Sequence, residues 1–243
     1  MTGPGFHVAG GGPVIPSFGH ASACLKNNGW FCVGWVHEHW GDTLQPALVQ
    51  HIKLTVIAVG IGFVIAFLLA LVGFRWRIFD GPIGASTDFL YALPSIALFQ
   101  LLLPVTGITT TTILIPLVAY TLFVLYRNIV AGLNGVPAEV LESARGMGLT
   151  RRQTFFRVEL PLAVPAIMGG VRVATVATIS IATVAAFLIH YGLGGPIFDA
   201  LGQPDIFRTE LVAASALAVL LALAADALLA ALQRALTPWS RIR

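Results

Sequence analysis

Few side chains in this sequence are placed for catalysis or metal binding. His37, Glu38 and His39 could suggest a metal site, but side chains two residues apart diverge on a helix, and only a strand would align both imidazoles. His190 and Tyr191 fall at the expected outer end of an apolar block, where amphipathic side chains are common. The sequence has no GxxxxGKS/T phosphate loop, no GxSxG nucleophile turn and no HExxH pair. We therefore expect no enzyme activity, no metal site and no cofactor in this chain, and a membrane-embedded hydrolase built on the His37 region would lack its nucleophile or metal set.

Asp226 is an acidic residue inside an apolar block. In a proton-coupled transporter an acid at such a position would carry the proton. It also lies eight residues before Arg234, about 12 Å by helical rise, so it could approach an interface or pair with a basic residue of another helix. We favour structural pairing. A proton-coupled secondary transporter is the remote alternative, and it would predict inverted internal repeats that we do not find in the sequence.

The composition identifies the class of protein to which these residues belong. Of the 243 residues, 57% are hydrophobic and 10% are charged, and the mean hydropathy is +0.86. These values exclude a soluble globular domain and a disordered chain. Because the apolar residues come in separated blocks of about 20 without sustained alternation, we predict an all-α polytopic membrane protein and not a barrel. The net charge is +3, but the basic residues lie between apolar blocks, so no nucleic-acid partner is expected.

The apolar blocks predict about five transmembrane helices. The first has 21 residues without a charge, enough to cross a hydrocarbon core of about 30 Å. We expect the second and third to form a tight hairpin, and Pro94 and Pro165 to bend their helices. The expected spans are residues 54–74, 89–106, 108 or 111 to 126, 165–189 and 211–232.

Basic residues indicate the orientation of these spans. Ten of the fourteen lysines and arginines fall on one side, which is therefore expected to be cytoplasmic. Five spans then place the N-terminus outside and the C-terminus inside. We expect an extracytoplasmic or interfacial segment over 1–47, a transmembrane domain over 48–235 with a cytoplasmic loop at 132–160, and a cytoplasmic tail over 236–243. The ten residues are Arg75, Arg77, Arg127, Arg145, Arg151, Arg152, Arg157, Arg234, Arg241 and Arg243.

The N-terminal segment contains both cysteines and three tryptophans. If it lies outside the cytoplasm, Cys24 and Cys32 could form a disulfide that closes a small loop, and two free thiols are an equal alternative. Because a basic start and an A-x-A site are missing, we expect no cleaved signal peptide. The tryptophans are expected to form an aromatic belt at the membrane interface: Trp30, Trp35 and Trp40.

The loop over 132–160 carries the densest local pattern. Pro137 suits the first turn of a short helix, and Gly146 and Gly148 supply its stop. Thr150 followed by Gln153 is a capping box, which predicts a second short helix over 151–159. The loop therefore predicts a helix, a glycine turn and a helix lying at the membrane surface.

The same loop resembles the EAA signature of permease subunits of bacterial ABC importers. That signature is Glu-Ala-Ala, three residues, Gly, nine residues, then an aliphatic residue, any residue and Leu-Pro. This chain matches it from Glu142 to Pro161, with Ser143 in place of the first alanine. The resemblance implies a coupling helix that docks into a groove of the ATPase subunit. The residues that it assigns to this role are Glu142, Ser143, Ala144, Arg145, Gly146, Gly148, Leu160 and Pro161.

Another interpretation of this loop is an amphipathic helix held on anionic lipid by its arginines. The match of four separate elements across 20 residues favours the coupling helix. Small residues there allow close backbone approach, and charges at the rim suit a docking surface.

The resemblance extends over about 50–234 and is similar to the osmoprotectant branch of these permeases. The stretches that carry it are YALPSIALF at 91–99, the string over 142–187, and GLGGPIFDAL at 192–201. It implies a type I, methionine-importer-like fold in the bacterial cytoplasmic membrane, and import of glycine betaine, choline, carnitine or proline by alternating access. It also implies two ABC ATPase subunits that hold ATP and Mg, a second identical or homologous permease, and an extracytoplasmic binding protein. An amino acid or another betaine-like solute is the alternative substrate.

A permease needs a translocation path near the membrane middle. A quaternary ammonium substrate would favour small, mildly polar or aromatic linings over fixed charge. The candidate lining residues are Tyr91, Ser95 and Gln100 on the second span and Thr175, Thr178, Ser180 and Thr183 on the fourth. The alternative for the serines and threonines is a hydrogen bond to their own backbone or to a neighbouring helix.

Overall fold

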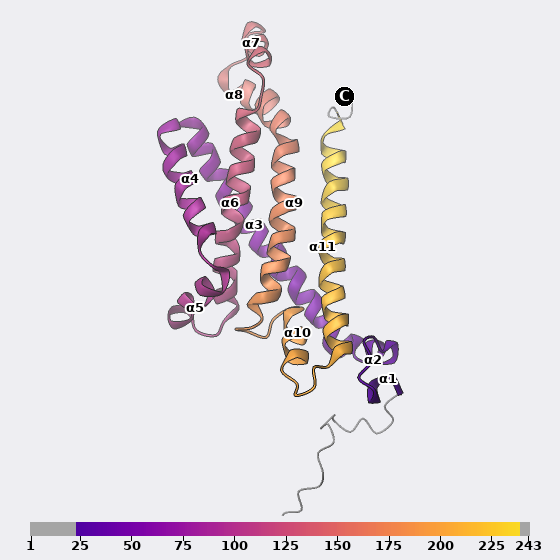
Figure 1. The fold of residues 1–243 in the computed structure, drawn as a ribbon. Helices are drawn as coiled ribbons and strands as arrows, with labels where there is room; N and C mark the ends of the chain where they lie inside the picture. Colours follow the sequence, from indigo (N-terminus) through magenta and orange to yellow (C-terminus); the bar gives the residue numbers. More distant parts are fainter. Residues whose placement is uncertain (1–22, 239–243) are drawn as a thin grey trace, which may run out of the picture.

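The computed structural model describes residues 23–238, which form a bundle of helices without a β-strand (Figure 1). Four helices are long and apolar enough to cross a membrane, and a bent pair of shorter helices makes up to a fifth span. The predicted all-α polytopic fold with about five spans is therefore confirmed. The four long helices are α3 (Gln45–Arg75) preceded by the π-helical turn η1 (Trp40–Leu44), α6 (Thr110–Asn134), the continuous helix Arg151–Ala185, and α11 (Arg208–Leu236).

The second predicted span is wrong in its extent. The sequence predicts one bent helix over 89–106, whereas the structure has α4 (Arg77–Ala92) and α5 (Ser95–Thr106), which meet at 93°. Leu93 between them is extended, with ψ of 135°, because the ring of Pro94 disfavours the helical conformation in the preceding residue. The chain thus descends along α4 beside α6 and turns sharply into α5 (Figure 1).

The second predicted loop helix is also wrong, because it does not end near Glu159. α8 (Arg151–Thr154), the π-helical turn η2 (Phe155–Glu159) and α9 (Leu160–Ala185) follow one another without a break. In η2 the backbone N–H of Leu160 donates to the carbonyl of Phe155, five residues back. A π-turn of this kind lets a helix accommodate Pro161, whose ring would clash in a regular α-helical interior. Residues Arg151–Ala185 therefore form one continuous helical rod, which runs from the loop through the bundle.

Three helices, α3, α6 and α9, make the centre of the bundle, with α4 against α3 and α6 and with α11 against α9. Small residues allow the close approach. A Cβ at Gly170 of α9 would lie 2.5 Å from the Asn128 Cβ of α6, and one at Gly62 of α3 would lie 1.8 Å from the Thr121 hydroxyl. The buried side chains at this centre include Leu54, Ala58, Ala66, Ala70, Leu117, Leu125, Tyr126, Ile129, Ala163, Ile167, Ala174 and Ala182.

The N-terminal segment folds against the start of α11. Cys24 of α1 (Ala23–Lys26) and Cys32, which precedes α2 (Val33–Glu38), are joined by a disulfide. Trp35 is only 4% exposed and makes an edge contact with Phe207, so the predicted interfacial belt does not include it. Trp35 is buried because Ala213 and Ala214 of α11 have small side chains, which leave room for it to pack against that helix. Trp30 and Trp40 remain exposed.

The two ends of the bundle differ in what they carry (Figure 1). One end holds α7 (Ala138–Gly146), α8, the corner between α3 and α4, and the last turn of α11. The opposite end holds α1, α2, α5 and α10 (Gly194–Leu201). Of the predicted basic set, seven residues belong to the elements of the first end: Arg75, Arg77, Arg145, Arg151, Arg152, Arg157 and Arg234. Arg127 lies within α6, seven residues before its end, and Arg241 and Arg243 lie outside the described residues.

Candidate functional site

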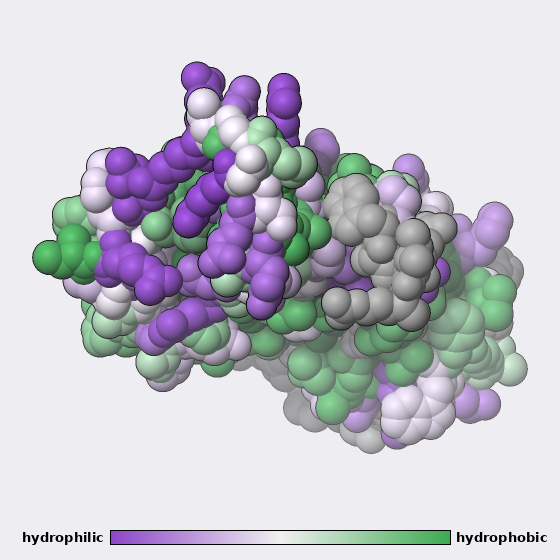
Figure 2. All heavy atoms as spheres, turned by 90° about the horizontal axis from the view of Figure 1, so that it is seen from above, coloured by the Kyte–Doolittle hydropathy of each residue, from purple (hydrophilic) through white to green (hydrophobic). Residues whose placement is uncertain are grey.

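The EAA surface, defined as α7 with residues 147–153, projects from one end of the bundle (Figure 1). Seen from that end, hydrophilic side chains gather over it (Figure 2). Glu142, Ser143 and Arg145 are exposed, and Met147 is 72% exposed. The arrangement offers a charged helix with an apolar tip to a partner surface.

A glycine turn ends α7. Gly148 has φ of +79°, in the left-handed region that favours glycine, and its N–H donates to the carbonyl of Arg145 at 2.9 Å. A Cβ at Gly148 would meet nothing within 4 Å, so the constraint comes from the backbone conformation alone. Gly146 also has open space, but it has no positive φ. The predicted stop is therefore confirmed, with Gly148 as the residue that requires glycine.

The departure from the EAA signature, Ser143, has a local explanation. Its hydroxyl donates to the carbonyl of Glu139, one turn earlier on α7, at 2.8 Å. The polar group is thereby satisfied within the helix. The next residue, Ala144, is 1% exposed, so a larger side chain at this position would have to displace its neighbours.

The capping box predicted at the start of α8 is confirmed. The Thr150 N–H donates to the Gln153 side-chain oxygen at 2.8 Å, and the Gln153 N–H donates to the Thr150 hydroxyl at 3.4 Å. These reciprocal bonds satisfy two N–H groups that a helix start leaves unpaired. They fix the direction in which the long rod leaves the EAA surface.

A cavity of about 1120 Å³ lies beside the EAA surface, between α7, α8 and the α3–α4 corner. Five arginines and one glutamate are the charged residues among its lining, so its potential is positive. Such a cavity suits an acidic partner. The charged lining residues are Arg75, Arg77, Arg145, Arg151, Arg152 and Glu159.

The last two residues of the signature, Leu160 and Pro161, do not join the exposed part of the site. They form the first turn of α9, and Leu160 packs against the core cluster that contains Ile129 and Ala163. Their position ties the rod to the bundle, which is a supporting role for the surface beyond it.

Asp226 of α11 pairs with Arg172 of α9. The guanidinium donates to both carboxylate oxygens, at 2.8 and 2.9 Å. The predicted pairing with a basic residue of another helix is confirmed.

The predicted path residues on α9 have hydroxyls that bond their own helix. Thr178 is buried and donates to the Ala174 carbonyl at 2.7 Å. Ser180 is exposed. The same one-turn bond is made by Thr175, Ser180 and Thr183, to Val171, Val176 and Ile179.

The predicted path residues on the second span lie around the helix break. Tyr91 is 45% exposed near the end of α4, Ser95 begins α5, and Gln100 is exposed along α5. Tyr91 and Ser95 flank the break, and the 93° bend directs α5, with Gln100, away from the axis of α4.

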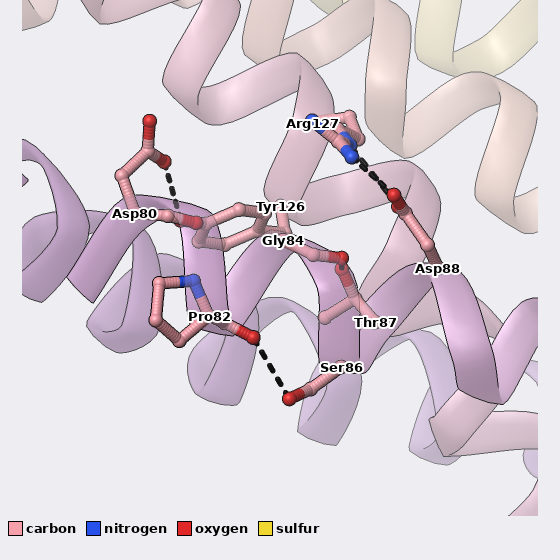
Figure 3. A network of polar contacts seen from close by, with 8 residues as sticks. All are labelled: Asp80, Pro82, Gly84, Ser86, Thr87, Asp88, Tyr126 and Arg127. Carbon is pink, nitrogen blue, oxygen red and sulfur yellow. Dashed lines mark hydrogen bonds and ion pairs between the residues drawn. The ribbon is translucent and has the colours of Figure 1, made fainter. Parts of the chain in front are cut away.

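Polar contacts fasten α4 to α6, and sequence reasoning missed them (Figure 3). The Tyr126 hydroxyl donates to Asp80 at 2.6 Å, and Arg127 forms an ion pair with Asp88 in which Nε donates to Oδ1 at 3.2 Å. The Tyr120 hydroxyl donates to the carbonyl of Leu93 at the helix break. The signal in the sequence was the position of these residues. Asp80 and Asp88 precede the second apolar block, and Tyr126 and Arg127 end the third, so two antiparallel helices can bring them together.

Comparison with known proteins agrees with this geometry. Residues 51–242 match the family described as binding-protein-dependent transport system inner membrane component. The choline transport system permease protein OpuBB of Bacillus subtilis (strain 168) is 35% identical over 199 residues, which cover 82% of this chain and 90% of that protein. The osmoprotectant import permease protein OsmW of Salmonella typhimurium (strain LT2) is 34% identical over 200 residues, covering 80% and 92%.

A solved structure has the same fold. An inward-facing form of the MetNI methionine ABC transporter superposes with a TM-score of 0.67 at 19% identity, covering 79% of this chain and 95% of that chain. This likeness confirms the predicted methionine-importer-like, type I architecture. The chain therefore belongs to the family of binding-protein-dependent transport system inner membrane components and is a multi-pass permease subunit of an ABC importer.

Proposed function

We propose that this permease imports osmoprotectants, namely glycine betaine, choline or related quaternary amines, and proline, across the bacterial cytoplasmic membrane. The observation that carries the proposal is the EAA surface on a rod that continues into the bundle. The names of the relatives OpuBB and OsmW support the substrate class. The N-terminus would lie outside and the C-terminus in the cytoplasm, in keeping with the arginines near the EAA end.

The full transporter would contain two copies of an ABC ATPase, which hold ATP and Mg, and a second permease of the same or a related sequence. An extracytoplasmic binding protein would deliver the solute. One chain offers one EAA surface, so a pair of permeases is needed to engage two ATPases. In this arrangement α7 and Met147 enter a groove of the ATPase.

The rod gives a physical route for coupling. When the ATPases close on ATP, they would displace α7, and the capped start of α8 would pass that displacement into α9 without an intervening loop. Because α9 packs against α6 and is paired to α11 through Arg172 and Asp226, the movement would reach the whole bundle. Packed helices move as units, which suits alternating access.

The translocation path would run along the face that contains Tyr91, Ser95 and Gln100. The exposed Ser180 is a further candidate, and Thr178 and Thr183 stay predictions whose hydroxyls are already bonded within α9. The helix break beside Tyr91 supports this placement, because irregular backbone at membrane depth is tolerated where it lines a cavity or is buried in protein.

A competition assay tests the substrate class. The chain would be reconstituted with its ATPase and binding protein, and uptake of radiolabelled glycine betaine would be measured against unlabelled choline, carnitine, proline and methionine. We expect saturable, ATP-dependent uptake that choline or carnitine blocks. If methionine or another amino acid alone blocks uptake, the osmoprotectant assignment is wrong and the amino acid alternative replaces it.

A further inference from the structure

The break between α4 and α5 lies beside Tyr120 of α6. The hydroxyl of Tyr120 reaches the Leu93 carbonyl at the break. Phe123, one turn further along α6, is 13 residues after Thr110 and 11 before Asn134, the two ends of that helix. Since helix breaks in the hydrocarbon region persist only in protein or beside a water-filled cavity, this break marks a place that lipid does not cover.

Aromatic rings surround this place. The rings of Tyr91 and Phe123 stack with centroids 4.4 Å apart, and the ring of Tyr120 meets Tyr91 edge-on at 5.8 Å. Tyr91 is nevertheless 45% exposed, so part of its ring is open to a ligand. Aromatic faces attract cations, and quaternary ammonium groups are a frequent ligand of such clusters.

An ion pair lies one turn away on the same two helices (Figure 3). Asp88 is three residues before Tyr91 on α4, and Arg127 is four residues after Phe123 on α6. The side chains of Arg127 and Asp88 are 52% and 43% exposed. Half-exposed charges within membrane helices rarely face lipid and usually mark a polar pathway. The ion pair and the aromatic rings therefore lie about 5.4 Å apart along the same two helices, at positions that one pathway can serve.

We propose that Tyr91, Phe123 and Arg127 form a transit site for zwitterionic quaternary ammonium solutes inside the permease. The rings would hold the ammonium group, and the Arg127 guanidinium would hold the carboxylate. While the site is empty, Asp88 holds Arg127 in position and balances its positive charge. This site rests on the proposed function, and it assigns to the permease a share of the selectivity that the binding protein begins.

The first test removes the ring of Tyr91. Tyr91→Leu should slow uptake of glycine betaine roughly five- to tenfold at saturating binding protein, whereas Tyr91→Phe should keep most of it. Phe89→Leu is the matched control, because Phe89 lies two residues away on α4, is 64% exposed and contacts no ring of the cluster. If Tyr91→Leu and Phe89→Leu transport equally well, the aromatic half of the site is wrong.

The second test removes the ion pair as a unit. The double variant Asp88→Asn/Arg127→Gln leaves no unpaired charge, so it should insert and fold. Choline has no carboxylate, so the ratio of glycine betaine uptake to choline uptake should fall roughly tenfold in this variant. A merely structural role would slow both solutes alike and leave the ratio unchanged, which would overturn the carboxylate half of the site.

The same preparation separates this inference from the proposed function. If the unmodified transporter takes up neither glycine betaine nor choline, both are overturned. If it takes up both solutes while the variants match the unmodified chain, the transit site is wrong and the proposed function stands.

Discussion

Arg172 and Asp226 form a two-point ion pair that joins α9 to α11, with donor–acceptor distances of 2.8 and 2.9 Å. Gln233 of α11 adds another contact between the two helices, because its side-chain N–H donates to the Pro165 carbonyl of α9 at 3.2 Å. A carboxylate held by both oxygens suits a structural tie between helices better than a proton carrier. The proton-coupled alternative therefore has no support from this residue.

We predict that Asp226→Asn lowers the thermal stability of the purified permease more than Arg172→Gln/Asp226→Asn does. The single variant leaves the Arg172 charge without its carboxylate, and the double variant removes both charges. Thermal unfolding in detergent, followed by the fluorescence of a tryptophan or by aggregation, would measure the difference. A double variant less stable than the single would show that the pair is not the reason for the loss.

We predict that Gly148→Ala weakens ATPase association and uptake, whereas Gly146→Ala does so far less. An alanine at φ of +79° costs about 1–2 kcal/mol, and the strain can be relieved only by moving the end of α7. Both glycines have open space around them, so the comparison isolates backbone conformation from size. Co-purification of the ATPase would be the readout. Equal losses in both variants would show that the left-handed conformation of Gly148 is not the cause of the loss.

We predict that Ser143→Ala leaves uptake unchanged. The Ser143 hydroxyl is bonded to the Glu139 carbonyl of the same helix, and alanine restores the residue that the EAA signature has there. Ala144→Leu is the contrasting change, since Ala144 is 1% exposed and a larger side chain would lift α7 from its support. Initial rates of ATP-driven uptake would be compared. A strong loss in Ser143→Ala would mean that this hydroxyl contacts a partner.

We predict that Cys24→Ala/Cys32→Ala lowers stability by roughly 2.5 kcal/mol, from the entropy of the short loop that the disulfide closes. Chemical unfolding curves of the two proteins would give the difference. A loss within error of zero would mean that the packing of Trp35 on α11 holds this segment alone.

The topology is tested through the same two sulfurs. After mild reduction of intact cells, a membrane-impermeant maleimide should label Cys24 and Cys32, because this end of the bundle is proposed to face outward. Labelling only after lysis would reverse the orientation, and with it the assignment of the EAA surface to the cytoplasm.

Local features were predictable from the sequence because their causes are local. The glycine at 148, the Thr150–Gln153 capping box and the four long apolar helices each depend on residues close together in the chain. The EAA spacing added the partner class, since it is a pattern of docking residues and not of folding alone.

Other features depend on contacts that the sequence does not display. The sequence analysis does not predict α4 as a membrane helix from its start, because Asp80 and Asp88 interrupt the apolar run. Their charges are compatible with a membrane only because Tyr126 and Arg127 of α6 bond to them. In the sequence Trp35 resembles an interfacial residue, whereas in the structure the alanines of α11 provide a surface against which it is buried.

The central claim is that ATP hydrolysis, transmitted through the EAA surface, drives solute uptake. The most direct measurement is glycine betaine uptake by proteoliposomes that contain this permease with its ATPase and binding protein, energised either by ATP or by a proton gradient. Gly148→Asp serves as the uncoupled variant. We predict uptake with ATP alone, none with the gradient alone, and none in Gly148→Asp although the variant inserts. Uptake driven by the gradient without ATP, or full ATP-driven uptake in Gly148→Asp, would contradict the account.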